Sequence, residues 1–321
     1  MREVAFIKQN KEKWLEFEEV ISNNQKKDPD LLAELHIQIM NDLAYAQSFY
    51  PKSKVVPYLN KLAKTSYTNV YHTKRTNENA FVSFFLDSVP LLAYTYRKYI
   101  YLAFAFFFFC FFIGLLSTLN DHTFARQILG NHYVDTTLEN IESGDTLAVY
   151  KGGSDWGAFI GIYFNNQRVG LLMFLSGLFA GIGSGFYIVY NGIMVAVFQA
   201  LFYQYNSFWD SVKGIWIHGT YEIFGMIIES AAGYIIGASI LFPGTLKRFE
   251  SFKRGMRDAF YIFLSTIPFT IIAAFLEGYV TRYSNVMPAF LCYSIILFCL
   301  VTISYYYLIY PFKVARKHQL R

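Results

Sequence analysis

The sequence predicts an all-α polytopic membrane helix bundle of about six transmembrane helices, with an N-terminal cytoplasmic helical domain. Two observations favour this fold class. Of the 321 residues, 54% are hydrophobic and only 16% are charged, whereas soluble globular domains carry about 25% charged residues. Charged residues are also frequent in the first hundred positions, while residues 101–119 contain none. This asymmetry separates a water-facing region from a lipid-facing one.

The N-terminal domain is expected to comprise residues 1–79. In its first segment Val4, Trp14 and Phe17 recur at roughly helical spacing among Lys and Glu residues, which predicts an amphipathic helix. Asp residues before the second segment, and prolines after it and at the start of the third, mark the other boundaries. We therefore expect helices at residues 2–22, from about 28 to 50 and from about 57 to 72.

The remaining chain alternates between apolar and polar segments. Residues 80–98 are expected to lie in the headgroup plane as an amphipathic elbow, and residues 99–119 are long enough to cross the ~30 Å of hydrocarbon as the first span. Residues 120–166 are expected to form an extracytoplasmic acidic loop. A five-helix transmembrane core, 167–312, precedes a basic cytoplasmic tail, 313–321. Its spans are expected at 167–187, 188–206, 215–242, 259–280 and 287–311, with a tight connection around Tyr190–Gly192.

Basic residues indicate the orientation of these spans, because positively charged segments tend to remain in the cytoplasm. They cluster at Arg97-Lys98, between Lys247 and Arg257, and in the C-terminal tail. Six spans place all three clusters on one side. We therefore expect a multi-pass protein of the bacterial inner (plasma) membrane with both termini cytoplasmic. Nucleic acid is not an expected partner, because no recognised nucleic-acid motif accompanies these charges.

The span at 215–242 carries ionisable side chains. His218, Glu222 and Glu229 are spaced i, i+4 and i+11, which places them along one face of a helix. An ionisable group near the bilayer centre costs about 2.5–3.5 kcal/mol on insertion scales, so such groups usually face a protein interior or a water-filled cavity. Glu277, in a later span, is the expected fourth member of this intramembrane polar centre.

Three interpretations of the polar centre remain open. In the first, the side chains hydrogen-bond other helices and only determine packing. In the second, the carboxylates line a path for protons, ions or a solute. In the third, the His and Glu side chains bind a metal ion. Hydrolysis is disfavoured, because the helical metalloprotease motif needs two His four residues apart and Glu222 occupies the second position. We assign no catalytic residue and expect no cofactor.

Small residues predict close helix packing. Gly177, Gly181 and Gly185 recur every four residues, a spacing that lets membrane helices approach until their backbones touch. Asn191 and Gly192 are assigned to the same packing role. Packing within the chain is favoured over a homodimer seam. The expected partner surface on the span at 215–242 is Ala231, Gly233 and Gly237.

Several separated motifs resemble the stage II sporulation protein M family of bacterial membrane proteins. The most specific is His218-Gly219-x-x-Glu222, and Phe275-x-Glu277-Gly278 accompanies it. The resemblance covers nearly the whole chain. Its other segments are Asp42–Pro51, Val56–Asn60, Asn165-Asn166, the glycine ladder and Tyr190–Gly192.

The resemblance implies a membrane protein that, in spore formers, belongs to a complex that remodels peptidoglycan, with the enzymes as its partners. In other bacteria it implies an association with a MoxR-type ATPase and von Willebrand-type domain proteins. The leading hypothesis is therefore a non-enzymatic membrane scaffold that recruits envelope or cytoplasmic proteins. A transporter or channel that uses the His/Glu stripe is the alternative, and an intramembrane metal-dependent hydrolase is the third.

Overall fold

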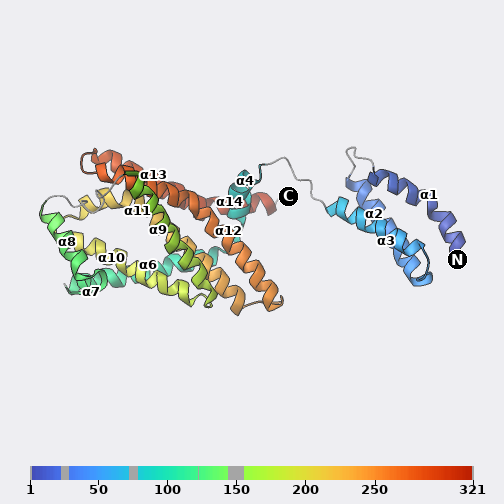
Figure 1. The fold of residues 1–321 in the computed structure, drawn as a ribbon, viewed down its shortest axis with the longest axis horizontal. Helices are drawn as coiled ribbons and strands as arrows, with labels where there is room; N and C mark the ends of the chain where they lie inside the picture. Colours follow the sequence, from blue (N-terminus) through green and yellow to red (C-terminus); the bar gives the residue numbers. More distant parts are fainter. Residues whose placement is uncertain (1, 23–28, 72–78, 122, 144–154, 320–321) are drawn as a thin grey trace. The chain divides into compact units, whose positions relative to one another are not determined.

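The chain is described by a computed structural model and consists of helices. It divides into two compact units, Met1–Asn79 and Ala80–Arg321, and no strand occurs in the described part of either (Figure 1). Residues 144–154 of the predicted acidic loop and the last two residues of the tail lie outside the described residues. The structure describes residues 2–22, 29–71, 79–121, 123–143 and 155–319.

Three helices form the first unit, at the positions that the sequence predicts: α1 (Glu3–Ser22), α2 (Pro29–Phe49) and α3 (Val55–Tyr71). Trp14 and Phe17 are buried in their common core. Val4 is 78% exposed, however, and Phe6 takes the core position at the start of α1. The Trp14 indole donates to the Asp42 carboxylate at 2.8 Å, so the core is joined to α2 by a polar contact as well.

The second unit begins with the predicted elbow. It comprises α4 (Ala80–Ser83), the π-helical turn η1 (Phe84–Ser88) and α5 (Val89–Thr95), and it leads into α6 (Arg97–Asn120). The elbow packs against the C-terminal helices, where the Tyr306 hydroxyl donates to the Phe85 carbonyl at 3.0 Å. The hydroxyl of Tyr96, at the turn into α6, donates to Asp258 at 2.9 Å.

Helix α11 (Phe208–Leu241) lies at the centre of the bundle and contacts α6, α9, α10, α12 and α13. Helices α9 and α13 run parallel to α11, whereas α10 and α12 run antiparallel to it. The remaining elements are α7 (Phe124–Leu129), α8 (Asn131–Glu142), α9 (Asp155–Leu175), η3 (Ser176–Leu178), α10 (Ile182–Gln204), α12 (Arg248–Phe275), η4 (Leu276–Val280), η5 (Thr281–Tyr283), α13 (Ala289–Ser304), η6 (Tyr305–Ile309) and α14 (Tyr310–Gln319).

Five helices of the described part are long and apolar enough to cross a membrane: α6, α10, α11, the continuous Arg248–Tyr283 and the continuous Ala289–His318. The predicted span at 167–187, the second of the six, has the wrong bounds. Helix α9 begins at Asp155, and the chain turns at Phe179–Gly181 rather than near Asn191, which lies within α10. With 21 residues, α9 is about 31 Å long, but its polar run from Asn165 to Arg168 resembles a loop in the sequence.

The glycine ladder also differs from its prediction, because its residues do not lie along one helix. Gly177 belongs to η3, Gly181 has a φ of +82° at the start of α10, and Gly185 follows in α10. A side chain at Gly177 would collide with the backbone of Gly233, and one at Gly237 with the backbone at Gly181. The glycines therefore form a tight turn that packs against α11 of the same chain.

The predicted acidic loop is largely helical where it is described. Helices α7 and α8 pack against the end of α10, with Ala125 and Val134 buried beside Val197. Arg126 and Asp135 form an ion pair at 2.6 Å between the two short helices. The last part of the predicted loop is the first half of α9, since apolar residues on both sides of Asn165 continue the helix.

Candidate functional site

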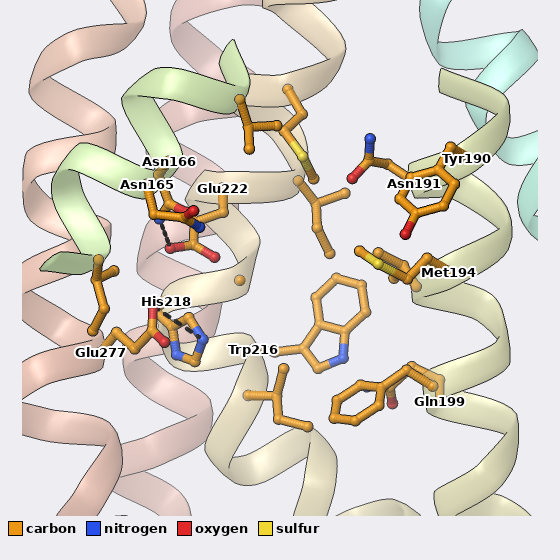
Figure 2. A pocket seen from close by; sticks show the side chains of 18 of the residues that line it. Asn165, Asn166, Tyr190, Asn191, Met194, Gln199, Trp216, His218, Glu222 and Glu277 are labelled. Carbon is orange, nitrogen blue, oxygen red and sulfur yellow. Dashed lines mark hydrogen bonds and ion pairs between the residues drawn. The ribbon is translucent and has the colours of Figure 1, made fainter. Parts of the chain in front are cut away.

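A cavity of about 480 Å³ lies in the second unit, between α9, α10 and α11 (Figure 2). Glu277 reaches it from η4, which continues α12. Ile128 and Tyr133, of α7 and α8, line the same cavity, so the two short helices stand at one end of it. All four members of the predicted polar centre line this cavity: His218, Glu222, Glu229 and Glu277.

Three of these side chains gather into a cluster. Ligand atoms of His218, Glu222 and Glu277 all lie within 4.8 Å of one another. The Nε2 atom of His218 is 3.9 Å from a carboxylate oxygen of Glu277, and both side chains are largely buried. Figure 2 shows the imidazole and the two carboxylates on the same wall of the cavity. Helical spacing explains His218 and Glu222, whereas only the packing of α12 against α11 adds Glu277.

Contacts to neighbouring polar groups hold the cluster in place. The Nδ1 atom of His218 hydrogen-bonds the Thr281 hydroxyl at 2.9 Å, and the Asn166 amide donates to the Glu222 carboxylate. Glu277 lies in a single π-helical turn, a local widening of the helix that often occurs at functional sites. The orientation of His218 and Glu222 is therefore set by residues of η5 and α9.

Glu229 does not join the cluster. It lies seven residues beyond Glu222, about 10 Å further along α11, and its carboxylate accepts a hydrogen bond from Thr266 at 2.8 Å. Only 2% of Glu229 is exposed. The cavity therefore holds a cluster of three ionisable groups and a fourth, separate carboxylate.

The wall formed by α10 is neutral. Tyr190, Asn191, Met194 and Gln199 face the cluster across the cavity, and Trp216 of α11 lies between the walls (Figure 2). The Asn191 amide donates to the Tyr187 carbonyl at 2.9 Å, so this predicted packing residue also lines the cavity. Gly192 is a packing residue, since a side chain there would press on the Phe107 carbonyl and Cys110 of α6.

Sequence reasoning missed the polar residues of α9, α12 and η5 that support the site. Asn166 falls within the predicted loop, although it bonds Glu222, and the neighbouring Gln167 donates to Thr270 of α12. The signal was the polar run itself between two apolar stretches, because polar side chains at membrane depth usually face a protein interior or a cavity. Thr266 and Thr281 gave no comparable signal, since a lone threonine is common in membrane helices.

The charge balance of the cavity determines what it can bind. Three carboxylates and one imidazole line it, and none of the described lining residues is Lys or Arg. Carboxylates close together in a site of low dielectric repel each other unless one of them is protonated or a positive charge lies between them. The arrangement therefore suits a cation better than an anion or an apolar ligand.

A family model described as Stage II sporulation protein M matches residues 103–282, more than half of the chain. The chain belongs to the stage II sporulation protein M family. The match runs from α6 to η5 and includes every residue that lines the cavity. The site is thus part of the family's region of the chain.

The first unit of this stage II sporulation protein M family member matches a different family model. That model, Domain of unknown function (DUF8413), covers residues 4–72, which correspond to α1–α3. No curated protein and no solved structure matches the chain. The two family matches follow the division of the chain into two units.

Proposed function

We propose that this protein takes a cation from one face of the membrane into the cavity beside α11 and transfers it across the bilayer. The observation that carries the proposal is the set of three carboxylates that line one intramembrane cavity without a lysine or arginine among its described lining residues. Ionisable groups at membrane depth are expensive and usually mark an ion or substrate pathway.

The positions of the carboxylates suggest a direction of entry. The cluster lies nearer the end of α11 that is close to α7 and α8, and Glu229 lies further along the same helix. Beyond Glu229, the backbones of Gly177 and Gly233 meet without space for a side chain. We therefore infer that the route begins at the α7–α8 end of the cavity and is blocked beyond Glu229, where these backbones pack together.

Basic residues indicate which side that is. The end of the bundle opposite α7 and α8 carries Lys247, Arg248 and Lys253 around the start of α12. Under the positive-inside rule that end is cytoplasmic, and both chain termini are then cytoplasmic as well. The cavity would accordingly receive its cation from outside the inner membrane.

Transport is tested by flux measurements in proteoliposomes with a panel of monovalent and divalent cations. Uptake of at least one cation is expected, and Glu222→Gln and Glu229→Gln should each reduce it, because they remove charge while retaining hydrogen-bonding capacity. Glu139→Gln, in the exposed part of α8, is the matched control. No uptake of any cation above that of empty liposomes would overturn the proposal.

A second role, non-enzymatic scaffolding of an envelope or peptidoglycan-remodelling complex, is favoured by the first unit. Ile37 and Met40 are exposed side by side on α2, at 60% and 46%, although α2 belongs to a compact unit with its own core. Large contiguous apolar patches on a surface mark protein interaction sites, so these two residues are the place on the first unit where such a surface is tested. Proteins of the MoxR-type ATPase or von Willebrand-type domain classes are the partners to test.

The two roles respond differently to the same variants. Scaffolding predicts that Ile37→Glu combined with Met40→Glu abolishes co-purification of such a partner, whereas Glu222→Gln leaves it intact. Transport predicts that Glu222→Gln reduces cation flux, whereas the Ile37→Glu and Met40→Glu double variant leaves flux intact. If the α2 variant retains the partner, the recruiting surface is elsewhere and this assignment of α2 fails.

A further inference from the structure

We propose that His218, Glu222 and Glu277 bind a divalent transition-metal ion and leave a coordination position open toward the cavity. The inference rests on the proposed function in one respect, namely that the cavity receives cations. It adds the chemical class of the cation and the three side chains that hold it.

Distances within the cluster suit a metal centre. Transition metals such as Zn²⁺ lie about 2.0–2.2 Å from nitrogen and carboxylate ligands, which places tetrahedral ligand atoms about 3.4 Å from one another. The ligand atoms of the cluster lie within 4.8 Å of one another, and the His218 Nε2 atom is 3.9 Å from Glu277. Side-chain rotations that shorten these separations to about 3.4 Å would bring all three onto one ion.

The cluster has the supporting hydrogen bonds that metal-ligating side chains usually have. A ligating histidine usually uses one ring nitrogen for the metal and donates the other N–H to a fixed acceptor, and ligating carboxylates are hydrogen-bonded in turn. Here the Thr281 hydroxyl bonds Nδ1 of His218 at 2.9 Å, and Nε2 lies 3.9 Å from the Glu277 carboxylate. Asn166 bonds the Glu222 carboxylate from the opposite side of the cluster.

The ligand types select among metals. Imidazole suits Zn²⁺, Fe²⁺ and related ions, whereas Mg²⁺ and Ca²⁺ are bound almost entirely by oxygen. One imidazole with two carboxylates therefore favours a first-row divalent transition metal. None of the chain's three cysteines lines the cavity, so thiolate-preferring ions such as Cu⁺ are not favoured.

Three protein ligands beside a cavity leave room for another. Structural zinc sites are closed by four protein ligands, while sites that exchange ligands keep a position for water or a substrate. The described cluster has three ligand residues, and the cavity of about 480 Å³ adjoins it. An ion held in this way remains accessible to water or to an oxygen-containing ligand.

Equilibrium Zn²⁺ binding tests the inference. The full-length protein, purified in detergent and stripped with chelator, is expected to bind about one Zn²⁺ per chain by titration calorimetry and elemental analysis. His218→Ala, Glu222→Gln and Glu277→Gln should each weaken binding at least about tenfold, and Thr281→Val by a smaller factor. Glu229→Gln is the control, because Glu229 is a buried carboxylate of the same cavity that lies outside the cluster.

Each outcome has a definite meaning. Absence of Zn²⁺ binding by the folded wild-type protein, or binding that survives Glu222→Gln and Glu277→Gln, overturns the metal site. Co²⁺ titrated in place of Zn²⁺ provides a second readout, because its visible absorption should appear with the wild type and Glu229→Gln and disappear with Glu222→Gln. Zn²⁺ binding without flux would leave the metal site standing and refute transport, whereas flux of other cations without Zn²⁺ binding would do the opposite.

Discussion

The carboxylate of Glu229 lies so close to Gly170 of the neighbouring helix α9 that a Cβ atom at position 170 would overlap it. Thr266 of α12 donates to the same carboxylate at 2.8 Å. Glu229 is therefore confined between α9 and α12, at a point where only glycine leaves space for it. Its position is set by two helices that are remote from it in the sequence.

Replacing Gly170 with alanine should destabilise the bundle. The added methyl group must displace either the Glu229 side chain or α9, and such overpacking typically costs about 1–3 kcal/mol. We expect a lower Tm for the detergent-solubilised Gly170→Ala protein in a thermal unfolding experiment. A Tm equal to that of the wild type would contradict the contact between Gly170 and Glu229.

The same helix offers a control for this prediction. A Cβ at Gly161 would meet no atom within 4 Å, so Gly161→Ala adds a methyl group to α9 without a collision. Alanine is also the better helix former by up to about 1 kcal/mol. We expect the Tm of Gly161→Ala to equal or exceed that of the wild type, which separates a steric effect from any general effect of changing α9.

Gly233→Ala should likewise destabilise the contact between α11 and the turn that joins α9 to α10. A Cβ at Gly233 would overlap the Ser184 hydroxyl and lie 2.8 Å from the Met173 carbonyl. On the same helix, the nearest atom to a Cβ at Gly225 is 3.8 Å away. The Tm should therefore fall for Gly233→Ala, with an expected cost of about 1–3 kcal/mol, and change little for Gly225→Ala. If both variants lower the Tm equally, the close approach of other residues to Gly233 does not explain the destabilisation.

Tyr96→Phe should weaken the joint between the elbow and α12. The Tyr96 hydroxyl donates to the Asp258 carboxylate at 2.9 Å, and hydrogen bonds to charged groups contribute about 1.5–3 kcal/mol. Tyr101→Phe is the control, because Tyr101 is 45% exposed on α6. Thermal unfolding near neutral pH should show a lower Tm for Tyr96→Phe only.

The contribution of Tyr96 should also depend on pH. Burial, followed by the hydrogen bond to Asp258, raises the pKa of Tyr96 from 10.0 to about 12. A raised pKa in the folded state means that the stabilisation is fully present below the unfolded pKa of about 10 and is lost as the pH rises through about 12. The difference in Tm between wild type and Tyr96→Phe should stay constant between about pH 7 and 9 and shrink above about pH 10. A difference that grows with pH would contradict this assignment.

Trp14→Ala should unfold or loosen the first unit alone. Trp14 is 2% exposed, and truncation of a buried tryptophan costs about 3–5 kcal/mol. Its hydrogen bond to Asp42 is lost as well. Hydrogen exchange followed by mass spectrometry should show faster exchange in α1–α3 and no change in α11, because α11 belongs to the other compact unit. Val4→Ala, at a position that is 78% exposed, should leave exchange in α1–α3 as it is.

The sequence was sufficient for the fold class, because lipid-facing helices need long apolar runs whatever they pack against. It failed at α9. There the polar run from Asn165 to Arg168 interrupts the apolar pattern, so the segment resembles a loop, and the start of the helix at Asp155 was missed. Only the contacts of Asn166 with Glu222 and of Gln167 with Thr270 show why a membrane helix contains these residues.

The glycine ladder shows the same limit in another form. Its four-residue spacing predicts one helical face, yet Ala180 and Gly181 have positive φ values and turn the chain between two helices. The close approach to Gly233 and Gly237 agrees with the expected partner surface on α11. Spacing thus indicated that backbones meet, but it could not distinguish a helix from a turn.

By itself, the sequence determined that the protein is a helical membrane protein and that His218, Glu222 and Glu229 share one helix, because both follow from hydropathy and from the helical repeat. Tertiary structure alone decided that Glu277 joins His218 and Glu222 while Glu229 stands apart. The physical reason is that the repeat relates residues within a helix, whereas the distance between side chains of different helices depends on how closely those helices pack.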